Sequence, residues 1–195
     1  MEYHFNTTSA FLGAIFQLEF SSTSCKGDLI LVTSRDTDNF FKISLEEEDK
    51  VNFYYKHEDG DFNLRISPSH NKTFCDGQRH NIEVKRYGKM VTYSTDGGEE
   101  MQTKDTSVKI AIFSKPDKIT LGGSHDKFDG CMFSALVLFH GKTDLSKNVS
   151  VNIIERYLKR DPRVHSAAVF PGACPNSKSP AKGDYEIRGK PLSML

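Results

Sequence analysis

Regularly spaced turn residues constrain this chain more than any other feature of its sequence. Residues 76–98 read DGQRHNIEVKRYGKMVTYSTDGG, with Asp-Gly at one end, Asp-Gly-Gly at the other and Tyr-Gly-Lys between them. Ile82 and Val84 alternate with polar residues before the central turn, and Val91 and Tyr93 do so after it. Side chains on a strand point alternately to the two faces of a sheet, so this stretch predicts a β-hairpin with one buried face.

The same alternation recurs along the chain with turn signals between the runs, which predicts an all-β sandwich or barrel rather than βαβ units. Helical spacing occurs in VNIIERYLKR, where one or two turns of helix are expected before Asp161-Pro162. The predicted strands lie at residues 16–20, 29–32, 41–45, 51–55, 82–85, 91–94, 109–113, 118–121 and 131–139.

Length and composition set the domain organisation. A chain of 195 residues is long enough for one all-β domain with a sizeable core. After Cys174-Pro175 it turns polar and rich in Pro, Ser, Lys and Gly, so we expect one domain over residues 1–174 and a polar linker or disordered tail over 175–195. The 26 basic residues balance 26 acidic ones, which gives no indication of a nucleic-acid partner. No apolar run reaches the length of a membrane span.

Cysteines and glycosylation sequons favour an extracellular protein that is secreted, in the matrix or at the cell surface. The four cysteines are even in number and widely spaced, without a C-x-x-C pair, which favours disulfides over zinc. The start, MEYHFNTTSA, lacks the layout of a signal peptide, so we expect a domain excised from a larger protein. The N-glycosylation pattern occurs at Asn6, Asn71 and Asn148.

Taken in order, several segments resemble a laminin G-like domain, the module of laminin α chains, agrin, perlecan and neurexins. The segments are FQLEFSSTSCKGDLILVTS, DGQRHNIEVKR, ITLGG, FDGCMFSALVLFHG and the closing GACP. The resemblance implies a two-sheet antiparallel jelly-roll sandwich of the concanavalin-like, laminin G type. The chain departs from the family pattern at Arg79, where the family has Trp, and at Cys25 and Cys75, which the common pattern lacks.

The resemblance also implies disulfides and a metal site. The family's closing bridge implies Cys131 with Cys174, which leaves Cys25 with Cys75 as the second pair. Many members bind one Ca²⁺ at a rim of the sandwich, and the ligand positions fall near Asp38, Asn39 and Ser114. Any calcium is expected to bind weakly, because a hydroxyl is a poor replacement for a carboxylate. The alternative is that these acidic and amide residues are ordinary turn formers.

Basic residues near the hairpin and a following loop suggest glycan binding, because members of the family bind heparan sulfate and the acidic glycan of α-dystroglycan through such clusters. The alternative is that these lysines only solubilise the surface. An integrin-type partner is a further hypothesis, since Lys-Gly-Asp occurs at residues 26–28 and 182–184. The glycan-binding candidates are Lys85, Arg86, Lys89, Lys115 and Lys118.

The sequence therefore predicts a non-enzymatic adhesion or recognition module of a larger matrix or cell-surface protein. No nucleophile elbow, P-loop or H-E-x-x-H motif is present, and GGSHDKFDG is explained as a polar loop. Two alternatives stay open: a carrier that holds a small apolar ligand between its sheets, as the related sex-hormone-binding globulin does, and a structural spacer.

Overall fold

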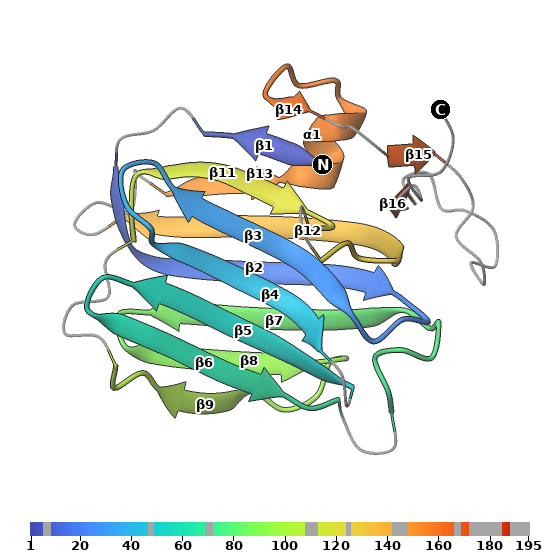
Figure 1. Ribbon diagram of the computed structural model, residues 1–195, viewed down its shortest axis with the longest axis horizontal. Coiled ribbons are helices and arrows are strands. Elements are labelled where there is room, and N and C mark those ends of the chain that lie inside the picture. The colour runs from blue at the N-terminus through green and yellow to red at the C-terminus, as the bar shows by residue number, and fades with distance from the viewer. Residues whose placement is uncertain are drawn as a thin grey trace.

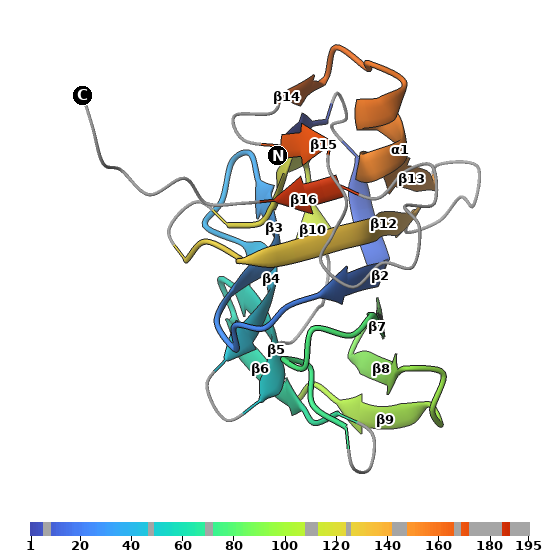
Figure 2. The same cartoon turned by 90° about the vertical axis from the view of Figure 1, so that its right-hand side faces the viewer.

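A computed structural model shows two antiparallel sheets packed face to face, the jelly-roll sandwich that the sequence predicted (Figure 1). It describes residues 1–5, 9–46, 49–68, 72–107, 113–123, 126–141, 148–165, 169–171 and 185–187. Turned by 90°, the molecule shows the two layers side by side, with the single described helix at one end (Figure 2).

The first sheet has seven strands in the order β14-β1-β11-β3-β4-β5-β6 and lies nearer to the viewer in Figure 1. Its strands are β14 (Val164–His165), β1 (Glu2–His4), β11 (Pro116–Leu121), β3 (Gly27–Ser34), β4 (Phe40–Glu46), β5 (Lys50–His57) and β6 (Gly60–Ile66).

The second sheet has nine strands, and the path β15-β16-β12-β2-β7-β8-β9 contains seven of them. These are β15 (Val169–Pro171), β16 (Tyr185–Ile187), β12 (Gly130–Gly141), β2 (Ala10–Ser21), β7 (His80–Tyr87), β8 (Met90–Thr95) and β9 (Met101–Lys104). The remaining two strands, β10 (Phe113–Ser114) and β13 (Val149–Asn152), pair with β2 and β12 respectively.

Aromatic rings fill the space between the sheets. Phe16 of β2 is fully buried, and its ring centroid lies 5.3 Å from that of Phe41 on β4 in the opposite sheet. Phe113 and Phe139 stack with their ring centroids 5.9 Å apart in the same layer. Burying such side chains contributes roughly 1.5–3 kcal/mol each, so the period-2 pattern that predicted the strands also supplies the core.

The predicted hairpin is β7 and β8, and the predicted helical segment is α1 (Ile153–Leu158). Asn152 caps that helix by accepting a hydrogen bond from the Glu155 amide. No strand was predicted at β6, although Phe62, Leu64 and Ile66 alternate along it. In the part of the chain that the structure describes, no helix is long and apolar enough to cross a membrane.

Part of the predicted tail joins the second sheet. Residues Tyr185–Ile187 form β16, which pairs with Gly130–Met132 of β12 on one side and with β15 on the other. Their backbone is therefore an element of the sandwich, although they follow the boundary expected at residue 174. The rest of residues 175–195 lies outside the described residues, and the boundary stays a prediction.

Candidate functional site

Four chain connections meet at the edge of the sandwich where β2 begins. The Arg35 amide donates to the Lys115 carbonyl at 2.9 Å, and the Lys115 amide donates to the Ser9 carbonyl at 3.0 Å. The Gly88 amide donates to the Leu12 carbonyl at 2.9 Å. We call this edge the rim and define it as residues 34–39, 57–60, 87–90 and 115–117. The hairpin tip and the Lys115 loop, far apart in sequence, therefore share one edge, as β-sandwich topology allows.

The rim brings the two halves of the predicted calcium site together, and one of the predicted ligands, Asn39, is already hydrogen-bonded. Asn39 is buried, and its Oδ1 accepts a hydrogen bond from the Glu58 amide at 3.1 Å. The Lys115 ammonium forms an ion pair with Asp36. Asp38 is exposed, and the side chain of Ser114 lies outside the described residues.

Calcium requires six to eight oxygen ligands, and an ammonium group beside the acidic residues opposes a second cation. Among the described residues, the one group of at least three candidate ligands within 4.8 Å is Cys25, Asp49 and Cys75. Two of these are joined in a disulfide, so they do not bind a metal as thiolates. The Lys115–Asp36 ion pair disfavours a cation beside it, and the ligand set Asp38, Asn39 and Ser114 stays a prediction.

Arg86 is in the core and is not available to a surface ligand, which corrects its assignment to the basic cluster. It shares the inward face of β7 with Ile82 and Val84, because residues two apart on a strand point the same way. Its Nη2 donates to Asp105 Oδ2 at 2.6 Å, and its guanidinium lies 4.2 Å from the centre of the Tyr55 ring. Both charged side chains are almost completely buried, at 3% and 0% exposure.

Three of the remaining predicted lysines are paired with carboxylates. Lys85 Nζ lies 2.6 Å from Glu83 and 2.7 Å from Glu100. Hydrogen bonds from the ammonium to Glu100 and Glu83 raise the pKa of Lys85. Lys115 pairs with Asp36, and Lys118 Nζ lies 3.0 Å from Glu2 on the outer face of the first sheet.

Lys89 differs from these lysines, because it has no acidic partner among the described residues. In the rim connections, three cations (Arg35, Lys89, Lys115) stand against five carboxylates (Asp36, Asp38, Glu58, Asp59, Asp117). The formal charge of the rim is therefore negative, which opposes sulfate or carboxylate ligands.

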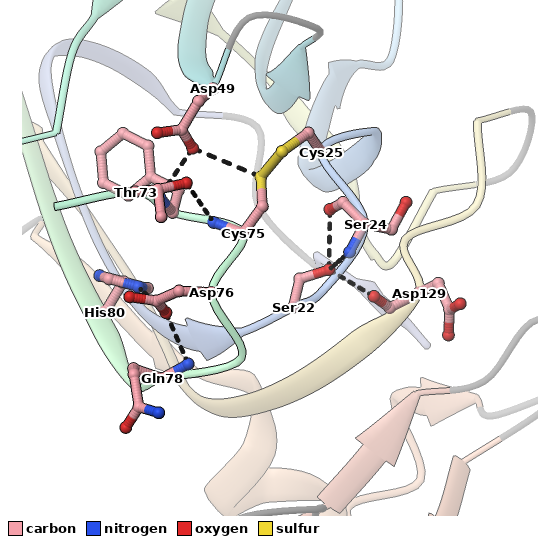
Figure 3. Close-up of a disulfide and its surroundings, with 11 residues drawn as sticks. Ser22, Ser24, Cys25, Asp49, Thr73, Cys75, Asp76, Gln78, His80 and Asp129 are labelled. Atoms are coloured by element: carbon pink, nitrogen blue, oxygen red, sulfur yellow. Dashed lines mark hydrogen bonds and ion pairs between the residues drawn. A yellow bond between two sulfur atoms is a disulfide. The ribbon is translucent and has the colours of Figure 1, made fainter.

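A disulfide joins Cys25 and Cys75 at the opposite end of the sandwich, as predicted (Figure 3). Their Cα atoms are 5.3 Å apart, and the bridge links the β2–β3 turn to the segment before β7. The Asp49 carboxylate accepts a hydrogen bond from the Phe74 amide at 2.7 Å and supports the same segment. Cys131 is buried on β12, but Cys174 lies outside the described residues, so their pairing stays a prediction.

His80 lies near the disulfide, and Asp76 lies beside its imidazole (Figure 3). Its Nδ1 is 3.0 Å from Asp96 Oδ2, and its Nε2 is 3.0 Å from Asp76 Oδ1. Burial raises the pKa of Asp76, but hydrogen bonds from His80 and the Gln78 amide outweigh it, so the pKa lies below its ordinary value. The carboxylates fix the imidazole under the end of β2.

The remaining predicted sites are only partly described. Asn148 is exposed at the start of β13, and its Oδ1 accepts a hydrogen bond from the Gly141 amide at 3.1 Å. Asn6 and Asn71 lie outside the described residues. Asp28, the last residue of the first Lys-Gly-Asp motif, is buried and is not presented to an integrin, and residues 182–184 lie outside the described part.

The fold defines a class of protein: a disulfide-linked jelly-roll sandwich with charged connections at one edge. The family model of the laminin G domain matches residues 20–142, more than half of the chain. The chain belongs to the laminin G domain family. Domains of this family are commonly extracellular adhesion modules, are generally non-enzymatic, and bind glycans and receptors.

Solved structures agree on the fold. Domains LG4-5 of the mouse laminin α1 chain match with a TM-score of 0.60 and 14% identity, over 78% of this chain and 44% of that one. The LG1-3 region of laminin α2 matches with a TM-score of 0.54 and 14% identity, over 70% of this chain and 29% of that one. A SAP-like pentraxin from Limulus polyphemus matches with a TM-score of 0.54 and 10% identity, over 70% of this chain and 68% of that one. The chain thus spans less than half of the laminin structures that it matches.

Proposed function

We propose that this chain is a non-enzymatic recognition module of a larger secreted, matrix or cell-surface protein, and that it binds a protein partner at the rim. Asp38 and Glu58 are exposed there without a cationic partner among the described residues, and this observation carries the proposal. The rim lysine Lys115 is neutralised by Asp36. An excess of carboxylates complements basic side chains on a partner and repels heparan sulfate.

The same geometry favours recognition over the carrier alternative. The described space between the sheets contains stacked aromatic rings, such as Phe41 and Tyr55 with centroids 4.4 Å apart. A small apolar ligand would have to displace them, which opposes binding because protein cores are closely packed. Asn148 is exposed where a glycan can attach.

Cell attachment to the immobilised domain tests this function. Cells of the source organism should attach to wells coated with the domain, and Asp38→Lys combined with Glu58→Lys should reduce attachment. Asp129→Lys is the matched control, since Asp129 is exposed near the opposite end of the sandwich. The wild-type domain should pass through a heparin column at physiological salt, where charges are screened beyond about 8 Å. Binding at the rim would be refuted if Asp129→Lys reduced cell attachment as much as Asp38→Lys with Glu58→Lys does. It would also be refuted if heparin retained the wild-type domain and the double variant were retained equally.

A further inference from the structure

A polar pocket lies far from the rim, on the outer face of the first sheet beside the start of β3 and the end of β4. Its volume is about 270 Å³, just below the roughly 300–1,000 Å³ of pockets that hold drug-sized ligands. We call it the β3–β4 pocket. The residues that give it its chemistry are Lys26, Asp28, Lys42, Ser44, Glu46 and Asp126.

Asp28 is the unusual group in this pocket. Only 9% of its side chain is exposed, and its Oδ1 makes no hydrogen bond in the described structure. Lys42 Nζ lies 3.3 Å from that oxygen without hydrogen-bond geometry. Burying a carboxylate with incomplete hydrogen bonding costs stability, and here only the ion pair with Lys42 compensates that oxygen among the described residues. A buried carboxylate held at the edge of a pocket points to a ligand.

The backbone around Asp28 is built to hold it in place. Its amide donates to the Asp126 carbonyl at 2.8 Å. Gly27 has a φ of +135°, and a Cβ at that position would lie 2.6 Å from Phe128 Cα. A Cβ on Gly123 would come within 3.0 Å of Asp28 Cβ. Neither position accepts a larger residue without a shift, so the carboxylate is on a rigid support, as binding sites require.

The opposite wall of the pocket comes from alternate residues of β4. Lys42, Ser44 and Glu46 share one face of the strand because side chains two residues apart point the same way. Glu46 Oε1 accepts a hydrogen bond from Asn52 Nδ2 at 2.7 Å, which fixes its carboxylate. Ser44 makes no side-chain hydrogen bond with the described residues, so its hydroxyl is available to a ligand.

The charges select the class of ligand. Two ammonium groups and three carboxylates line one small volume, so an anionic or a cationic ligand meets like charge in either case. A hydroxyl both donates and accepts, and can therefore bridge a carboxylate and an ammonium group. Lys42 is 30% exposed on a flexible chain and can move aside to let a hydroxyl reach Asp28 Oδ1.

Aromatic surface lies beside Lys42, just outside the lining of the pocket. Tyr54 on β5 is the register partner of Lys42, and its ring centroid lies 5.4 Å from that of Phe40. The Tyr54 hydroxyl is bonded to Asp61, which orients the ring on the same face of the sheet. A sugar carries hydroxyl groups on an otherwise apolar ring, and it therefore fits a surface where polar side chains lie beside aromatic ones. We propose that the β3–β4 pocket binds a neutral sugar residue of a glycan. This inference does not rest on the rim or its partner.

Protein-observed NMR titration with neutral methyl glycosides of glucose, galactose, mannose and N-acetylglucosamine tests the proposal, with glucuronate as the anionic probe. At least one neutral glycoside should give saturable shifts confined to residues 26–28 and 42–46, with a dissociation constant in the millimolar range. Asp28→Asn should weaken binding about tenfold, because it removes a charge-assisted hydrogen bond. Asp36→Asn at the exposed rim is the matched control and should change nothing.

The proposal is overturned if no neutral glycoside binds up to about 50 mM, well beyond a millimolar constant. It is also overturned if glucuronate alone binds, or if Asp28→Asn binds as tightly as the wild type. Should Asp28→Asn fail to fold, Ser44→Ala replaces it, since it removes only the hydroxyl, and unchanged binding by that variant would likewise reject the site. Neither outcome bears on cell attachment at the rim, so the two proposals fail separately.

Discussion

The buried pair Arg86–Asp105 provides the sharpest stability prediction. Asp105 is fully buried, and it accepts hydrogen bonds from Arg86 at 2.6 Å and from the Ser107 amide at 2.8 Å. The pair joins the segment that follows β9 to the inner face of β7. Asp105→Ala would leave the Arg86 guanidinium in the core without a counter-charge.

Removing one partner of a buried ion pair costs about 3–5 kcal/mol. In a domain of this size, about 1 kcal/mol lowers the melting temperature by roughly 2–4 °C, so we expect a fall of about 6–20 °C. The measurement is thermal and urea unfolding of the oxidised protein. Lys85→Ala is the matched control, because Lys85 is the next residue on β7 but faces solvent, where ion pairs contribute about 0–1 kcal/mol.

Replacing both partners should be much less harmful than replacing one. Arg86 Nη1 and the Tyr55 hydroxyl are buried without hydrogen bonds, so the wild-type arrangement is itself incompletely satisfied. We therefore expect Arg86→Met with Asp105→Leu to be clearly more stable than Asp105→Ala alone. This reasoning would be refuted if Asp105→Ala lowered the free energy of unfolding by less than about 1 kcal/mol. It would also be refuted if the double variant lost as much stability as its two substitutions lose, in sum, when each is made alone.

Three further predictions concern the disulfide, acid and calcium. Replacing Cys25 and Cys75 by Ser should destabilise the domain by up to about 4 kcal/mol on the chain-entropy account, measured by urea unfolding, and an unchanged midpoint would contradict it. The pKa values of Asp76 and Asp105 are lowered, so their stabilisation is present above the unfolded value near 4 and is lost as the pH falls through the folded values. Melting temperature should therefore drop steeply below about pH 4, and less so in Asp76→Asn. Because Lys115 occupies Asp36, about 10 mM calcium should leave the melting temperature unchanged, and a clear rise would show that the rim binds the ion.

Period-2 patterns were enough to predict most of the longer strands and an all-β fold, and the family resemblance added the sandwich. Ile82 and Val84 on one strand and Val91 on the next can bury one face only as a half-buried hairpin, and the structure has it. The short strands β1 and β14 carry too few residues for such a pattern to show. The burial of Arg86 could also have been predicted from the sequence, because Arg86 is two residues from Val84 and four from Ile82 and so lies on the same face of the strand. Its charge suggested a surface position, and the missing signal was its partner Asp105.

The sequence alone determined the fold class, the hairpin, the helix near residue 153 and the family resemblance, because these depend on local periodicity and turn chemistry. Only the tertiary structure decided which charges are available at the surface. Ion pairs such as Lys118 with Glu2 join residues 116 positions apart, and no local pattern encodes that neighbour. The same holds for Asp28, which a loop nearly a hundred residues later buries beside the β3–β4 pocket. Electrostatic availability depends on distance in space, and the chain fixes that distance only when it folds.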